Sequence, residues 1–172
     1  DYNLGNYINS ISGRHMLLWN GGCHVHEKFS VQAIATLKRR YPDALVMAHL
    51  ECKAPVLAMA DVKGSTAAML TYAQTHPEQK QFIVATEAGI LFELQRRCPG
   101  QEFIPVPPEV SEGEQLDSTV PTSCTCNECE FMKLNTLEKI IAALEHLQPE
   151  VTIPEDIARD AVKPIERMLE LS

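Results

Sequence analysis

Short blocks of apolar residues alternate with polar residues along the first two thirds of the chain, and their spacing changes between two periods. Compact or β-branched apolar runs of four to six residues are typical of buried strands. Such runs are found at residues 15–19, 44–48, 81–86 and 102–106, and residues 61–63 are a candidate for one further, brief strand. Between these runs the apolar residues recur at helical spacing, which predicts helices over about 29–41, 56–60, 64–75 and 88–97. A further helix is expected through about residue 11, capped by Asp1 or Asn3 and ended by Gly13.

Strands that alternate with helices in this way predict an α/β fold, with parallel strands in a sheet covered by helices on both faces. The composition changes to Pro, Glu, Ser and Thr at residues 107–122, which indicates a surface loop. Two helices are expected after it, the first with an apolar stripe and the second, opened by Pro154, with its apolar residues facing inward. We therefore divide the chain into residues 1–20, the end of a preceding α/β module; 21–110, an α/β module; and 111–172, a cysteine-bearing loop followed by the C-terminal helices.

Composition and charge narrow the functional classes. The 172 residues are 45% hydrophobic and carry a net charge of −8, which argues against a nucleic-acid partner. No apolar run approaches the roughly 18 residues of a membrane span. Six cysteines are too few for a disulfide scaffold, and their grouping with His and Glu is typical of cytoplasmic metal or redox chemistry.

Three cysteines lie close together as C-x-C-x-x-C, at Cys124, Cys126 and Cys129. Thiolates at this spacing bind a soft metal or cluster, or act as a redox pair; plain surface thiols are the third possibility. A complete zinc site would need a second cysteine pair or a histidine pair, and neither follows in the sequence. The remaining ligands must therefore come from elsewhere.

Polar residues with useful chemistry follow the predicted strands, where parallel sheets bind their ligands. They are Cys23, His49, Glu51, Ser65, Thr66 and Glu87. Cys23 follows two glycines, which allow a close approach of the backbone to a ligand, and we interpret it as a metal ligand. The neighbouring His24 and His26 either support the ligands of the site or are simply exposed, and exposure is the favoured interpretation. Cys52 and Cys98 are expected to be spectators.

His49 and Glu51 stand two residues apart just past a strand, so that an extended backbone places them on one side as an acid and base pair. A surface ion pair is the alternative. Ser65 and Thr66 follow Gly64 at a helix start, where hydroxyls and backbone N–H groups can bind a carboxylate or phosphate. Taken alone, this segment could equally be an ordinary helix cap.

Several motifs in order along the chain resemble the C-terminal part of quinolinate synthase, the iron–sulfur enzyme of NAD biosynthesis. The matching segments are residues 1–7, 19–26, 41–44, 49–52, 64–66, 83–89, 126–136 and 163–169. The resemblance implies three similar α/β modules around a pseudo-threefold axis, with a 4Fe–4S cluster held by one cysteine from each. It also implies that an N-terminal half, with the first cluster cysteine, is missing from this chain. One departure is Leu50, where the family usually has proline.

By position, Cys23 and Cys129 resemble the second and third cluster ligands. Cys129 is preferred to Cys126 because it precedes a Phe-Met segment as the ligand does in the family. His49 and Glu51 resemble the family's His-Pro-Glu substrate-binding pair, with both residues also catalytic, and Ser65 and Thr66 resemble its Ser-Thr carboxylate contact.

The implied reaction condenses iminoaspartate with dihydroxyacetone phosphate to quinolinate, with L-aspartate oxidase as an expected partner besides the missing module. Two alternatives remain. One is a non-enzymatic zinc-binding or thiol-redox module built on Cys124, Cys126 and Cys129. The other is a related hydro-lyase that uses the same kind of cluster on another hydroxy acid.

Overall fold

The chain forms two compact units in a computed structural model that describes residues 1–108 and 127–171. The first unit is Asp1–Glu130 and the second is Phe131–Ser172. Cys124 and Cys126 lie outside the described residues, so their predicted roles stay predictions.

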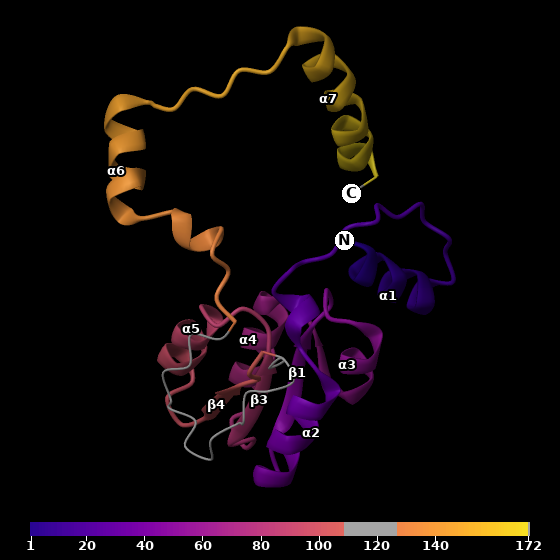
Figure 1. Cartoon of the computed structure of the whole chain (residues 1–172), viewed down its shortest axis with the longest axis vertical. Helices are drawn as coiled ribbons and strands as arrows, with labels where there is room; N and C mark the ends of the chain where they lie inside the picture. Colours follow the sequence, from indigo (N-terminus) through magenta and orange to yellow (C-terminus); the bar gives the residue numbers. More distant parts are fainter. Residues whose placement is uncertain (109–126, 172) are drawn as a thin grey trace, which may run out of the picture. The chain divides into compact units, whose positions relative to one another are not determined.

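Four parallel strands form the sheet of the first unit (Figure 1). The strands are β1 (Leu45–His49), β2 (Val62–Gly64), β3 (Gln81–Ala85) and β4 (Glu102–Pro105). Their order across the sheet is β2-β1-β3-β4, with every neighbouring pair parallel. The predicted α/β fold with a parallel sheet is therefore confirmed.

Side chains of the central strands alternate between two hydrophobic cores, one on each face of the sheet. In β1, Val46 and Ala48 join the core that contains Ile34 of α2 (Val31–Arg40) and Val56 of α3 (Ala54–Met59). Met47 joins the opposite core, which is formed with α4 (Thr66–Thr75) and α5 (Ile90–Arg97). Helices thus cover both faces, as the apolar runs predicted.

Capping side chains set the beginnings of several helices, at Asp1 and Ser65 as the sequence indicates and also at Ser30. Asp1 caps α1 (Tyr2–Ser12) by accepting a hydrogen bond from the Leu4 backbone N–H, and α1 ends at Gly13 with a left-handed φ of 66°. Ser30 and Ser65 cap α2 and α4 in the same way. Each hydroxyl or carboxylate satisfies one of the N–H groups that a helix start leaves without an intrahelical partner.

The strand predicted at residues 15–19 is wrong. This segment forms no strand and pairs with none of the described strands. Leu17 is fully exposed and Trp19 is 84% exposed. An apolar run indicates only that the side chains need burial, whereas a strand also needs a free sheet edge beside it.

The second unit contains a short 3-10 turn (Met132–Leu134), α6 (Leu137–His146) and α7 (Glu155–Glu170). Both helices are amphipathic and their apolar stripes are exposed, which for α7 differs from the inward orientation that we predicted. Ile140 is 50% exposed in α6, and Ile165 is 52% exposed in α7. A helix pattern predicts which face is apolar, but it does not supply the surface that covers that face.

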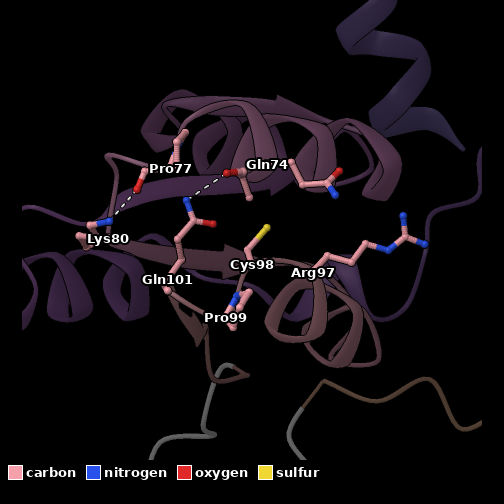
Figure 2. A pocket seen from close by; sticks show the side chains of 9 residues that line it. Gln74, Pro77, Lys80, Arg97, Cys98, Pro99 and Gln101 are labelled. Carbon is pink, nitrogen blue, oxygen red and sulfur yellow. Dashed lines mark hydrogen bonds between the residues drawn. The ribbon is translucent and has the colours of Figure 1, made fainter.

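A cavity of about 390 Å³, drawn in Figure 2, lies at the amino ends of β3 and β4. The predicted site is at the carboxyl ends of the strands. Gln101 reaches from one side and donates from Nε2 to the carbonyl oxygens of Ala73, His76 and Gln79 at 2.9–3.0 Å. Cys98 lines this cavity and is 7% exposed. None of the helices in the described residues is long and apolar enough to cross a membrane.

Candidate functional site

The predicted site residues gather at the carboxyl ends of β1 and β3. From β1 the chain runs to β2 on one side, and then crosses to β3 on the other side of β1. Such a change of direction opens a crevice between the two strands, where doubly wound α/β sheets bind their ligands. His49 is the last residue of β1, and Thr86 follows β3 directly.

His26 is a buried polar residue of this group, with 6% of its surface exposed. Its Nε2 lies 3.0 Å from Thr86 Oγ1, and its Nδ1 lies 3.1 Å from Glu51 Oε2, although that contact lacks hydrogen-bond alignment. The ring also stacks on His49, with 4.5 Å between centroids. His26 is therefore part of the site, and the prediction that it is exposed is wrong.

Burial determines the charge state of both imidazoles. It lowers the pKa of His26 to about 4, with the nearby His49 acting in the same direction, and it also lowers the pKa of His49. Glu51 opposes both shifts but does not overcome them. Both rings are consequently neutral near pH 7, where each has one nitrogen that donates and one that accepts.

The tautomer of neutral His49 follows from its backbone contact. The Glu51 backbone N–H donates to His49 Nδ1 at 3.3 Å, so that nitrogen is an acceptor and Nε2 holds the proton. Glu51 Oε2 is 3.7 Å from the same Nδ1, and the Glu51 side chain is 27% exposed. A partly exposed carboxylate beside a neutral imidazole, whose N–H is on the other ring nitrogen, is an arrangement suited to moving protons.

Cys23 lies half-buried in a loop that is tied to the start of α1. The Cys23 backbone N–H donates to Asp1 Oδ2 at 2.8 Å, and the Tyr2 backbone N–H donates to the Gly21 carbonyl at 2.9 Å. A Cβ on Gly22 would lie 3.1 Å from the Tyr2 ring and 3.2 Å from the Glu27 carboxylate. The glycine therefore lets this loop pack closely against α1, as well as shaping the approach to Cys23.

Glu27 also connects the Cys23 loop to α1. Its Oε1 accepts hydrogen bonds from Tyr2 Oη at 2.9 Å and from Asn3 Nδ2 at 2.5 Å. Its backbone N–H donates to the Cys23 carbonyl at 3.0 Å. The loop that presents the Cys23 thiol is thus fixed by side chains and backbone together.

Cys129 follows the undescribed segment and packs against the same hydrophobic core as Cys23. Its backbone N–H donates to Glu87 Oε1 at 3.2 Å, and Glu87 Oε2 accepts from the Gly89 backbone N–H at 2.7 Å. Asn127 attaches the same turn through its carbonyl to the Ala88 N–H and through its amide to the Val106 carbonyl. These contacts hold the Cys129 turn at the carboxyl end of β3.

Ser65 and Thr66 are placed beside β1 by the register of the sheet. His49 pairs with Gly64, so the start of α4 follows at the neighbouring strand end. Both side chains are exposed, and Ser65 Oγ accepts from the Ala68 N–H at 3.2 Å. Ser65 is therefore a helix cap whose hydroxyl proton is still available to an incoming acceptor.

Among the described residues, one group of side chains has the spacing of a metal site. The ligand atoms of Cys23, His26 and Glu51 all lie within 4.8 Å of one another. Cys52 belongs to the hydrophobic core against which Cys23 packs, but it is fully buried, and burial raises the pKa of its thiol to about 12. Its Sγ donates to the Ala85 carbonyl at 3.5 Å, so Cys52 behaves as a core residue.

Sequence reasoning missed Thr86 and undervalued His26. The available signal was weak: Thr86 comes last in a β-branched run, and His26 lies three residues after Cys23. Their contact spans sixty positions of the chain, which no local pattern reveals.

Comparison with known proteins places this geometry in context. A family model described as "Quinolinate synthetase A protein" matches residues 1–170. The chain is 49% identical over 172 residues to the quinolinate synthases of Thermosynechococcus vestitus and Chloroherpeton thalassium, and 47% identical to that of a Nostoc species. These matches cover 100% of this chain and 49–50% of each relative, so the chain spans about half the length of the curated relatives it matches. The chain belongs to the quinolinate synthase family.

Proposed function

We propose that this chain is the C-terminal part of a cytoplasmic quinolinate synthase, which condenses iminoaspartate with dihydroxyacetone phosphate and releases phosphate and water. The observation that supports it most is the meeting of Cys23, His26 and Glu51 at the sheet's switch point, in a chain of this family. The other half of the protein would supply the third α/β module, one further cluster cysteine and the remaining substrate contacts. L-Aspartate oxidase is a proposed partner because the reaction consumes an imino acid.

Cys23 and Cys129 would hold two irons of a 4Fe–4S cluster. The donor set fits this group, because both thiols are half-buried, border the same core and lie on loops fixed through their backbones. Soft thiolates are the ligands that iron–sulfur clusters prefer. Bound by three thiolates, such a cluster has one open iron that supplies Lewis-acid chemistry at a substrate oxygen or nitrogen.

His49 and Glu51 would carry out the proton transfers. The His49 Nε2–H donates to a substrate oxygen, since Nδ1 is engaged by the Glu51 backbone. The Glu51 carboxylate accepts a proton during tautomerisation and returns one during dehydration. His26, anchored on Thr86, limits where Glu51 Oε2 can lie.

Ser65 and Thr66 would bind a substrate carboxylate. Their hydroxyls and the free N–H groups at the start of α4 attract an anion, and the helix dipole adds to this attraction. The pairing of His49 with Gly64 puts the start of α4 at the strand end beside His49, which supports this assignment. The zinc or thiol-redox alternative gives no role to His49, Glu51 or the start of α4, and we do not favour it.

Replacing Glu51 with Gln in the full-length protein tests the proposal. The change keeps the size and one acceptor oxygen, but it removes the proton transfer. We expect turnover to fall by about 10²–10⁴-fold, the usual contribution of general acid–base catalysis, with unchanged iron content. Glu78→Gln is the matched control, because Glu78 is exposed and remote in the fold. Near-normal quinolinate formation by Glu51→Gln would show that Glu51 is only a surface carboxylate.

A further inference from the structure

The two cysteines that we assign to the cluster share an unusual backbone arrangement. In each case the cysteine N–H donates to a side-chain carboxylate rather than to another backbone group. The acceptor for Cys23 is Asp1 Oδ2 at 2.8 Å, and the acceptor for Cys129 is Glu87 Oε1 at 3.2 Å.

The second oxygen of each carboxylate binds the beginning of a helix. Asp1 Oδ1 accepts from the Leu4 N–H at 2.9 Å in the first turn of α1. Glu87 Oε2 accepts from the Gly89 N–H at 2.7 Å, at the residue that precedes α5. Each carboxylate therefore joins a rigid helix to a cysteine loop, and it uses one oxygen for each.

The Glu87 carboxylate occupies the space that a side chain at Gly89 would need. A Cβ on Gly89 would lie 2.6 Å from Glu87 Oε2, well inside contact distance. The backbone of Gly89 has an ordinary helical φ of −59°, so its glycine is not required by conformation. The absence of a side chain here serves the approach of Glu87.

We propose that Asp1 and Glu87 are positioning residues that hold the Cys23 and Cys129 loops in the geometry that binds the cluster. This inference rests on the proposed function for the identity of the bound group, but not for the two loop contacts. A hydrogen bond from an N–H to a charged acceptor is among the stronger ones in a protein. Loss of either contact removes one of the links that hold its cysteine loop and leaves the other loop unchanged.

Two conservative variants of the full-length protein separate the loops. Asp1→Asn and Glu87→Gln each keep a single acceptor oxygen, which cannot serve both N–H groups. In the cluster-free protein, amide hydrogen exchange is measured at single residues. We expect exchange at Cys129 to accelerate roughly ten- to hundredfold in Glu87→Gln, as for loss of a hydrogen bond to a charged group, with Cys23 unchanged. Asp1→Asn should accelerate Cys23 and leave Cys129 unchanged.

Two further variants cover the case in which the new side chain of Glu87→Gln keeps its oxygen on the Cys129 N–H. Glu87→Ala removes both oxygens, so it accelerates exchange at Cys129 even where the Gln side chain keeps its oxygen on that amide. Gly89→Ala displaces the Glu87 carboxylate without changing its charge, and it should reproduce the same effect at Cys129. Glu78→Gln again serves as the charge-matched control.

Iron and sulfide content after reconstitution completes the test. Faster exchange at Cys129 together with a clear loss of bound iron in Glu87→Ala supports the proposal. Wild-type iron content, or unchanged exchange at Cys129, in Glu87→Ala overturns it. If the wild-type protein itself binds no cluster, the proposed function fails, and the exchange data alone then decide whether the carboxylates position the two loops.

Discussion

Replacing Thr86 with Val tests the buried contact that organises the candidate site. The change keeps the branched shape of the side chain and removes only the hydroxyl that lies 3.0 Å from His26 Nε2. Thr86 is 4% exposed and His26 6% exposed, so water cannot readily replace the lost partner.

Thr86→Val should lower the stability of the fold, because it leaves the buried His26 Nε2 without a hydrogen bond. Such a loss lowers the free energy of unfolding by about 1–3 kcal/mol. His26→Phe removes the nitrogen and keeps a ring of similar size, so the double variant should lose less than the sum of the single variants. A coupling of about 0.5–1.5 kcal/mol is expected for one buried hydrogen bond.

Urea unfolding of the full-length protein, read at a transition that includes this unit, measures the four free energies. Val46 lies in the hydrophobic core of this unit and pairs with Ile83, three residues before Thr86. Val46→Ala therefore controls for general loosening of the packing. A Thr86→Val variant within about 0.3 kcal/mol of wild type, or strictly additive single variants, would refute the reasoning.

Two further predictions concern pH and association. Burial lowers the pKa of His26 from 6.5 to about 4, so that, as the pH falls, the unfolded chain binds a proton at His26 before the folded chain does. The free energy of unfolding should therefore be at its full value above pH 6.5 and fall by up to about 3 kcal/mol as the pH drops toward 4. His49 acts in the same direction, and His26→Phe should flatten the pH curve; a wild-type curve that is flat between pH 6.5 and 4 would contradict this. The 172-residue chain on its own should associate, since apolar side chains such as Trp19 and Leu144 are 84% and 73% exposed. Light scattering measures this, and a monomer at high concentration would be the opposite result.

The sequence predicted the layers of the fold well because period and capping are local. Apolar runs such as residues 81–86 mark strands buried on both faces, and Ser65 marks a helix start by its chemistry. Residues 15–19 show the limit of this reasoning. Their composition is that of a buried strand, but pairing depends on an edge elsewhere in the fold.

The candidate site was only partly predictable for a similar reason. Cys23, His49 and Glu51 follow a glycine turn or a strand end, so the rule for parallel sheets brings them to one edge. His26 and Thr86 are sixty positions apart in the chain, and only the three-dimensional arrangement reveals their contact. The burial that lowers the pKa of His26 has no signature in the sequence either.

Iron and acid-labile sulfide content in the oxygen-free, full-length protein tests the central proposal most directly. Cys23→Ala and Cys129→Ala should each abolish the visible absorbance of a 4Fe–4S cluster, because each removes one of its thiolates. Cys98→Ala, at the opposite end of the sheet, should keep it. Full iron and sulfide content in the Cys23→Ala variant would contradict the account.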